Sequence, residues 1–332
     1  MYIKPRPIPL NVHFSQALIP RLPSNHPKIP LIERDLRSFM SGYRGEKATE
    51  YHLNFLDDKK HHIFGGLRLP HEQHHFQMDT PILSRKYILI LETKNIGGEL
   101  YFTEEQFSQE SFYGRKGYKN PIVQVNRHKE QLQDWLESHR LPTIPLIPLV
   151  VLSNPSAIIR TDDPSILKKV CKVENLKNKL LDLTSSYTKD HLTERSLKKA
   201  SRLLLEDDTP LFPEVHKSYG LSPQEIIPGI RCPKCFSYRM MRIDRVWVCP
   251  HCLYHSNETY HDAILDYFLF HKTTMTNREF RQYLGIDSVN TANKLLRLLN
   301  LPSTGSNKGR VYHRPTDFLD QLESRYHRLH KK

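Results

Sequence analysis

Apolar residues recur at helical spacing in the stretch that begins at Leu31. Gly42 and Gly45 interrupt this pattern, and it resumes over residues 46–55. Because glycine disfavours the helical backbone, we expect the first helix of this region to be broken near these two positions.

Extended segments follow this helical stretch. We expect short strands over residues 62–69 and 76–83. A continuous apolar run at 87–91 (YILIL) fits a strand that is buried on both faces, and 145–153 (PLIPLVVLS) has the same character. Between these two runs, residues 122–139 have the apolar spacing of a helix.

The strand–helix–strand order from residue 87 to residue 153 predicts a parallel pair of strands joined by a right-handed crossover. Residues 107–120 are polar and aromatic and contain glycine, so we expect a loop there. The hydrophobic pattern therefore predicts an α/β domain in this part of the chain.

Three ionisable residues fall where the predicted strands meet. Residues two apart in a strand point to the same face, so Glu92 and Lys94 should project together from the end of the run at 87–91. Asp79 lies on the preceding strand of a predicted hairpin, within reach of the same point. Two converging carboxylates repel each other unless a cation lies between them, and their hard oxygen ligands suit Mg²⁺ or Mn²⁺. Such a site could hydrolyse a phosphodiester, whereas the alternative is a surface salt bridge between Glu92 and Lys94.

A longer stretch carries several separated motifs, namely Gly42-Tyr43-Arg44-Gly45-Glu46, Gln77-Met78-Asp79, Ile88 to Lys94 with Asn95 and Gly97-Gly98, and Asn120-Pro121 with Gln124. With these motifs in this order, residues 41 to about 153 resemble a NERD (nuclease-related) domain. That family is a branch of the PD-(D/E)xK restriction-endonuclease-like superfamily.

The resemblance implies a restriction-endonuclease-like mixed sheet flanked by helices. It implies that Asp79 and Glu92 ligate a catalytic Mg²⁺ or Mn²⁺ and that Lys94 is the catalytic lysine. Glu46 would be an additional acidic catalytic residue, and Gln124 an accessory polar one. From the residues alone, Glu46 equally suits the first turn of a helix, and Gln124 equally suits hydrogen bonding at a helix start.

The cysteines indicate a second, structural metal. Cys232-Pro-Lys-Cys235 and Cys249-Pro-His-Cys252 are separated by thirteen residues, and four thiolates satisfy tetrahedral Zn²⁺ without leaving an open position. This segment resembles the zinc ribbons of type IA topoisomerases. Redox chemistry is the alternative for paired cysteines.

Basic and aromatic residues are interleaved around the predicted zinc ribbon. Such a patch suits phosphate contact and base stacking, although a protein-binding ribbon is the alternative. The basic residues predicted to bind nucleic acid are Arg239, Arg242 and Arg245, and the aromatic residues beside them are Phe236, Tyr238 and Trp247.

The C-terminal region has the pattern of a helix-turn-helix followed by a small wing. Thr276 and Ser288 are helix caps, and Gly285 ends the first of the two helices. This resembles a winged helix, with a helical protein-interaction module as the alternative. In the winged-helix interpretation the major groove would be contacted by Asn290, Asn293, Lys294 and Arg297, and the wing would present Lys308 and Arg310.

The charge balance agrees with a polyanionic partner. Lys and Arg number 49 against 36 Asp and Glu, a net charge of +13 with a pI near 9.4. Such an excess favours nucleic acid as partner, although a generic basic surface is the alternative. No stretch reaches the roughly 20 apolar residues of a membrane span, and the N-terminus lacks the apolar core of a secretory signal. We therefore expect a cytoplasmic protein with no membrane partner.

The chain should divide into successive parts. We expect an extended, proline-rich arm at 1–35, the NERD nuclease-like domain at 36–160, a helical linker region at 161–228, the zinc ribbon at 229–258 and the winged-helix-like domain at 259–332. The leading hypothesis is a metal-dependent nuclease of the NERD type that acts on DNA, with DNA-processing proteins as further partners. The alternatives are a non-catalytic nucleic-acid-binding protein and a regulatory scaffold. The sequence does not distinguish DNA from RNA as the substrate, and it does not determine the oligomeric state.

Overall fold

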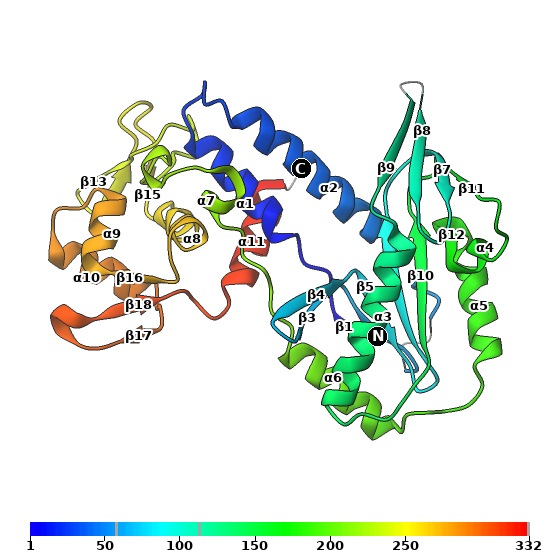
Figure 1. Cartoon of the computed structure of the whole chain (residues 1–332). Coiled ribbons are helices and arrows are strands. Elements are labelled where there is room, and N and C mark those ends of the chain that lie inside the picture. The colour runs from blue at the N-terminus through cyan, green and yellow to red at the C-terminus, as the bar shows by residue number, and fades with distance from the viewer. Residues whose placement is uncertain (57–58, 112–113, 331–332) are drawn as a thin grey trace. The chain divides into compact units, whose positions relative to one another are not determined.

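The computed structural model describes residues 1–56, 59–111 and 114–330 (Figure 1). The described chain forms two compact units. The first, here called the sheet unit, contains residues 1–7 and 38–211. The second, called the ribbon unit, contains residues 8–37 and 212–332.

The main sheet of the sheet unit contains β1 (Tyr2–Lys4), β2 (His62–Phe64), β5 (Thr80–Leu83), β6 (Ile88–Lys94), β10 (Leu146–Leu152) and β12 (Val170–Lys172). Its strand order is β1-β2-β5-β6-β10-β12. β5 pairs antiparallel with β6, whereas β10 pairs parallel with β6, as the strand–helix–strand pattern predicted. The mixed α/β fold expected from the sequence is therefore confirmed.

Both faces of β6 are buried, which confirms the interpretation of its apolar run. Ile88 and Ile90 belong to one hydrophobic cluster, together with apolar residues of α3 (Pro121–Ser138). Leu89 and Leu91 belong to a second cluster, together with apolar residues of α5 (Leu176–Ser186). Because successive side chains of a strand point to opposite faces, one continuous apolar run supplies both clusters.

The strands before β6 are shorter and more divided than predicted. The segment 62–69 contains β2 and the start of β3 (Leu67–His71), which are separated by a bend at Gly65 and by Gly66, whose φ is +76°. The segment 76–83 contains the end of β4 (His74–Met78) and β5, so that Asp79 lies at the junction between two strands. β3 and β4 pair with each other, whereas β2 and β5 belong to the main sheet, and this change of sheet explains both breaks.

The loop predicted over residues 107–120 is wrong for the described part of this segment. It contains β8 (Phe107–Ser111) and β9 (Gly114–Tyr118), which pair antiparallel with Phe107 opposite Tyr118. Together with β7 (Gly98–Phe102) and β11 (Ala157–Arg160) they form a sheet of order β11-β7-β8-β9. Pairing to β7 and packing of Phe107 against Phe102 stabilise a segment whose own composition favours a loop.

The predicted break in the first helix is also wrong. α2 (Ile29–Tyr51) runs through Gly42 and Gly45 without interruption. A Cβ atom at Gly45 would lie 2.5 Å from Ser153 Oγ and 2.7 Å from Asn95 Cβ. Gly45 is therefore a point of close approach between the helix and the ends of β6 and β10, and not a helix terminus.

The segment predicted as a linker contributes to the core of the sheet unit up to residue 211. It contains α4 (Ile166–Lys169), η2 (Val173–Asn175), α5 and α6 (Glu194–Glu206). Leu197, Ala200 and Leu204 of α6 are buried in the same cluster as Leu67 and Ile90. Lys198 and Lys199 are exposed on α6, whereas the opposite face of this helix packs in the core. The segment up to residue 211 is therefore a packed part of the sheet unit and not an exposed linker.

The extended arm predicted at the N-terminus is wrong from residue 10 onward. α1 (Leu10–Leu18) and η1 (Ile19–Arg21) follow Pro9, and they belong to the ribbon unit. Leu10, Phe14, Leu18 and Leu22 recur every four residues, which is a helical pattern that the many prolines obscured. Phe14 and Leu18 are fully buried in the core of the ribbon unit.

The described residues of the rest of the ribbon unit form five further α-helices, a small sheet of order β13-β14-β15 and a second sheet of order β16-β18-β17. Two successive helices followed by two short strands are present near the C-terminus, in the order that the sequence pattern predicted. The short strand directly before these two helices was not predicted. These elements are α7 (Val215–Tyr219), η3 (Pro223–Glu225), β13 (Met241–Ile243), β14 (Val246–Val248), β15 (His255–Ser256), α8 (Tyr260–Phe270), β16 (Thr274–Thr276), α9 (Asn277–Leu284), α10 (Val289–Leu298), β17 (Ser303–Thr304), η4 (Asn307–Gly309), β18 (Val311–His313) and α11 (Phe318–His330).

One core joins the parts of the ribbon unit. Trp247 and Cys249 are buried in the same cluster as Phe14 of α1 and Phe268 of α8. The cysteine-containing segment and the C-terminal helices thus share their hydrophobic contacts with residues from the N-terminal part of the chain.

Candidate active site and cysteine cluster

Asp79 is fixed beside the end of β6 by the register of the sheet. Thr80 lies opposite Leu91 in the antiparallel pair, so Asp79 comes level with Glu92. The main-chain N–H of Thr93 donates to Asp79 Oδ2 at 2.9 Å. The carbonyl oxygen of Asp79 accepts from the N–H of Gly66 at 2.8 Å. The hairpin predicted from the sequence is thus present, with Asp79 at its edge.

Glu92 and Lys94 point to the same side of β6, as their spacing predicted. Lys94 Nζ donates to Glu92 Oε1 at 2.7 Å. It also donates at 3.1 Å to Oε1 of Gln124, which lies on α3. Glu92 is only 1% exposed, so this contact is not the surface salt bridge that was the alternative interpretation.

A cavity of about 420 Å³ brings the five predicted residues together in the sheet unit. It is lined by Ser38, Ser41, Gly42, Glu46, Gln77, Asp79, Glu92, Thr93, Lys94, Asn95 and Gln124. These residues come from α2, from β4 and β6 and the residues next to them, and from α3. A hollow lined by converging carboxylates, a lysine and amides has the chemistry of a candidate active site.

Three carboxyl groups among the described residues line this cavity, those of Glu46, Asp79 and Glu92, together with the single lysine Lys94. Burial, together with the carboxylate of Asp79, raises the pKa of Glu92 to about 8. Burial and Asp79 likewise raise the pKa of Glu46 to about 7. Although burial lowers the pKa of Lys94, its contact with Glu92 outweighs that effect and the pKa is raised overall. Carboxylates that resist ionisation in this way are in a position to gain from a bound cation.

His128 is a site residue that the sequence analysis missed. Its Nδ1 lies 3.5 Å from Glu92 Oε2, and neither of these buried atoms has a hydrogen-bond partner among the described residues. Burial lowers the pKa of His128. The signal in the sequence was its position four residues after Gln124, which places both side chains on one face of α3.

The donor set fits a divalent metal ion. Glu92 presents a buried oxygen atom that has no hydrogen-bond partner in the part of the chain that the structure describes, and Asp79 adds a second carboxylate. Hard oxygen ligands of this kind suit Mg²⁺ or Mn²⁺. Asp79 and Glu92 are therefore the residues that could hold such an ion.

Glu46 is engaged differently from the other two carboxylates. Its Oε2 accepts a hydrogen bond from Nη1 of Arg6, a residue of the N-terminal segment. Arg6 is a second residue that the sequence analysis missed, because nothing local to it indicates a contact with residues 46 and 79.

The family comparison covers this same region. Residues 41–153 match the family model of the nuclease-related domain, NERD. This chain carries a nuclease-related domain. The match spans about a third of the chain and contains Glu46, Asp79, Glu92, Lys94 and Gln124. The resemblance seen in the sequence is thereby confirmed, and the nuclease-related domain suggests a nuclease-related function with nucleic acid as partner.

Searches among curated proteins and among solved structures found no match to this chain. In the described residues, no helix is both long enough and apolar enough to cross a membrane.

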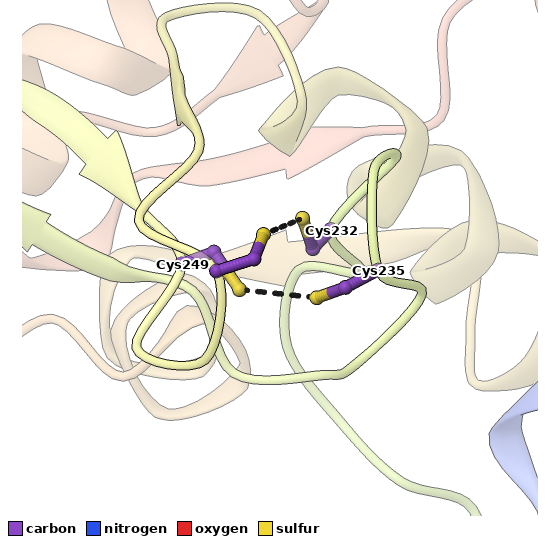
Figure 2. Close-up of side chains that lie close together, drawn as sticks. Cys232, Cys235 and Cys249 are labelled. Carbon is purple, nitrogen blue, oxygen red and sulfur yellow. Dashed lines mark hydrogen bonds between the residues drawn. The ribbon is translucent and has the colours of Figure 1, made fainter.

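The four paired cysteines converge outside the nuclease-related domain, in the ribbon unit. The Sγ atoms of Cys232, Cys235, Cys249 and Cys252 lie within 4.8 Å of one another. The side chains of Cys235 and Cys249 point toward each other (Figure 2). Their sulfur atoms lie 3.4 Å apart. This cluster fits a zinc ribbon, because four thiolates at such spacing could hold one tetrahedral Zn²⁺.

The two Cys-x-x-Cys pairs adopt the same local structure. In each, the residue after the second cysteine donates its N–H to the carbonyl of the first cysteine, from Phe236 to Cys232 and from Leu253 to Cys249. Both residues have a left-handed backbone, with φ of +64° and +56°. This repeated tight turn directs the thiols of each pair toward the other pair.

The aromatic residues predicted for base stacking are not equally accessible. Trp247 is completely buried, so its prediction as a stacking surface is wrong. It packs in the core of the ribbon unit, and Arg242 lies over its ring at 5.2 Å. Phe236, by contrast, is 58% exposed, and Arg239 and Arg245 are also exposed.

The residues predicted on the C-terminal helices lie on one exposed surface of α10. Ala292, Leu295 and Leu296 face the core, whereas Lys294 and Arg297 are exposed. Asn290 and Asn293 are exposed on the same helix, and the Asn293 side chain accepts from Asn277 Nδ2 at 2.8 Å. Lys308 and Arg310 are exposed in the segment between β17 and β18.

Proposed function

We propose that this protein is a metal-dependent nuclease that hydrolyses phosphodiester bonds of DNA. The observation that carries the proposal is the meeting of Asp79, Glu92 and Lys94 in one polar cavity of a nuclease-related domain. The net charge of +13 supports a polyanionic substrate. We place the protein in the cytoplasm, where the paired thiols would stay reduced and free to bind metal.

The carboxylates of Asp79 and Glu92 would hold one Mg²⁺ or Mn²⁺. When bound, the ion would polarise the scissile phosphate and lower the pKa of a water molecule beside it. Thr93 N–H holds one oxygen of Asp79 in place, and Lys94 holds one oxygen of Glu92. The other carboxylate oxygens are left for the cation.

Lys94 would act as a cation and not as a base. Its pKa is raised, so it keeps its proton at neutral pH. Its Nζ is oriented by Glu92 and by Gln124, which leaves one of its three N–H groups for a phosphate oxygen. A fixed positive charge at this point would stabilise the negative charge that develops during hydrolysis.

The ribbon unit would hold the substrate. We assign the cysteine cluster a structural Zn²⁺ and α10 with the β17–β18 segment a winged-helix role on duplex DNA. Lys294 and Arg297 are exposed on that helix, and Lys308 and Arg310 on that segment, which supports phosphate contact. Proteins of DNA processing would be its further partners.

The test is hydrolysis of duplex DNA, single-stranded DNA and RNA in the presence of Mg²⁺ or Mn²⁺. Wild type is compared with Asp79→Ala and Lys94→Ala, and with Lys198→Ala as a matched control. Lys198 is exposed on α6, far along the chain from the site residues, and its loss removes the same charge as the loss of Lys94. We expect the first two variants to lose cleavage at least 100-fold and the control to keep it.

Equal degradation by wild type and Asp79→Ala would identify a contaminant and refute the nuclease. Retarded migration of DNA without cleavage of any substrate would favour the alternative, a nucleic-acid-binding protein whose nuclease-related domain does not cut. Cleavage of RNA but not DNA would correct the substrate class.

A further inference from the structure

The first seven residues are built into the sheet that carries the candidate site. β1 pairs in parallel with β2, and Gly65 N–H donates to the carbonyl of Lys4 at 2.7 Å. A Cβ atom at Gly65 would lie 2.5 Å from the Cα of Arg6. The N-terminal segment therefore passes so close to Gly65 that only glycine leaves room for it.

Arg6 reaches from this segment to four groups around the site. Its side chain is 4% exposed. Nε donates to Glu50 Oε1 at 2.8 Å, and Nη1 donates to Glu46 Oε2. Nη2 donates to the carbonyl oxygen of Asp79 at 2.7 Å and to Thr80 Oγ1 at 2.6 Å.

We propose that Arg6 is a positioning residue of the metal site, so that this site depends on a residue that lies outside the nuclease-related domain, which begins at residue 41. The inference rests on the proposed function, because it assigns the metal to Asp79 and Glu92. It adds a part of the site that lies outside the family match.

Arg6 and Thr93 hold Asp79 from opposite ends. The guanidinium binds its carbonyl oxygen, and the main-chain N–H of Thr93 binds its carboxylate. Because both the backbone and the side chain of Asp79 are fixed, its other carboxylate oxygen, Oδ1, is already oriented before the metal binds. Metal binding then costs little conformational entropy at this residue.

Arg6 also determines what Glu46 does. Among the described residues, the cysteine quartet is the only group of three or more His, Cys, Asp or Glu ligand atoms within 4.8 Å of one another, so Glu46 does not form such a group with Asp79 and Glu92. Its carboxylate is bound to Arg6 instead. Glu46 therefore anchors the guanidinium to α2, and the metal is left to the two other carboxylates.

A lysine cannot replace Arg6. The side chain uses three different nitrogen atoms in a fixed planar arrangement, whereas the ammonium of lysine is a single point charge. Residues that orient metal ligands in this way commonly change metal affinity by roughly 10–100-fold when they are mutated.

The test is the affinity for Mn²⁺, measured by calorimetry on the full chain without nucleic acid. The zinc content is first made constant, so that only the second metal titrates. Arg6→Ala and Arg6→Lys are compared with Lys4→Ala. Lys4 is the last residue of β1 and lies two residues before Arg6. Its Nζ donates to Asp208 and to the carbonyl oxygen of Gly66, and neither of these residues lines the cavity.

We expect the two Arg6 variants to bind Mn²⁺ about tenfold more weakly and Lys4→Ala to bind as wild type does. Added methylguanidinium should restore the affinity of Arg6→Ala, whereas methylammonium should not. If Arg6→Ala does not fold, Arg6→Lys provides the comparison, since it retains the charge and most of the volume.

Normal Mn²⁺ affinity in a folded Arg6 variant would overturn the inference, as would an equal loss in Lys4→Ala. Its failure is distinct from that of the proposed nuclease. A chain whose Mn²⁺ affinity depends on Arg6 but which cuts no nucleic acid would retain the positioning role and refute the enzyme.

Discussion

Gly45 lies so close to Ser153 that a Cβ atom on the glycine would come within 2.5 Å of the serine Oγ. This contact sets the distance between α2 and the ends of β6 and β10. It also places Glu46, the next residue of the helix, at the cavity that holds Asp79 and Glu92.

We therefore predict opposite effects for two glycines of one helix. Gly45→Ala should destabilise the protein by about 1–3 kcal/mol, because the helix must move away from Ser153 and Asn95. Gly42→Ala should stabilise it by about 0.5–1 kcal/mol, since a Cβ there meets nothing within 4 Å and alanine favours the helix. Denaturant unfolding of both variants tests the pair, and a destabilised Gly42→Ala would contradict this account of the helix.

The raised pKa values of the site predict a pH dependence of the metal-free protein. The pKa of Glu92 is raised to about 8 and that of Glu46 to about 7, from an ordinary value of 4.5. The folded state thus binds these protons more tightly than the unfolded state does. Protonation of Glu46 and Glu92 therefore stabilises the folded state. This stabilisation is fully present below about pH 4.5 and is lost as the pH rises to 8.

Glu92→Gln isolates this effect. Without added Mg²⁺ or Mn²⁺, the melting temperature of the variant relative to wild type should rise between pH 5 and pH 8. Adding Mn²⁺ should raise the melting temperature of wild type more at pH 8 than at pH 6, because the ion binds the deprotonated carboxylates. A difference between variant and wild type that does not change with pH would show that Glu92 ionises normally.

The cysteine cluster predicts one bound Zn²⁺ per chain. Cys249→Ser should lose zinc and lower the stability of the ribbon unit, because Cys249 lies in the core beside Trp247. Cys171→Ser is the matched control, since Cys171 is buried in the sheet unit and lies outside the cluster. Metal analysis and thermal melting measure both, and full zinc content in Cys249→Ser would rule out the four-thiolate site.

The contacts of Arg21, the last residue of η1, predict that this part of the chain is required for folding of the ribbon unit. Its guanidinium is 1% exposed and binds Asp266 Oδ2 at 2.8 Å and the carbonyl of Ile227 at 2.7 Å. Arg21→Ala should cost about 3–5 kcal/mol, because it leaves buried acceptors without their partner. Arg34→Ala, at an exposed ion pair with its neighbour Asp35, should cost less than about 1 kcal/mol in the same unfolding measurement.

The exposed cations of α10 predict the salt dependence of DNA binding. The double variant Lys294→Ala/Arg297→Ala should bind duplex DNA more weakly, with a slope of log affinity against log salt that is smaller by about 2. Lys198→Ala/Arg202→Ala removes the same charge from exposed positions of α6. Fluorescence anisotropy over a salt series compares the two, and equal losses would assign the binding to net charge and not to α10.

Much of the candidate site followed from local pattern. The run at 87–91 predicted a strand buried on both faces, and the i, i+2 relation then placed Glu92 and Lys94 on one side of its end. The hairpin partner that carries Asp79 was also predictable, because strands adjacent in sequence commonly pair. The contact of Arg6 with Asp79 joins residues far apart along the chain, and no local spacing indicates it. Local spacing places His128 on the same face of α3 as Gln124, but its approach to Glu92 depends on how α3 packs against β6.

Several errors share one cause. Residues 107–120, Gly42 with Gly45, and residues 10–18 were each assigned from their own composition, and in each place packing against distant residues decided the structure. Phe107 packs on Phe102, Gly45 on Ser153, and Phe14 in a core with Phe268. Local propensities are worth at most about 1 kcal/mol per residue, so contacts of this kind override them.

The sequence by itself determined the two Cys-x-x-Cys pairs and the buried strand β6. It also determined that Glu92 and Lys94 point to the same side of that strand, because these features depend only on the spacing of residues in local structure. The tertiary structure alone decided that Arg6 meets Glu46 and Asp79, that His128 faces Glu92 and that Trp247 is hidden in a core. Such contacts depend on strand register and packing between distant segments, which the pattern of any one segment does not contain.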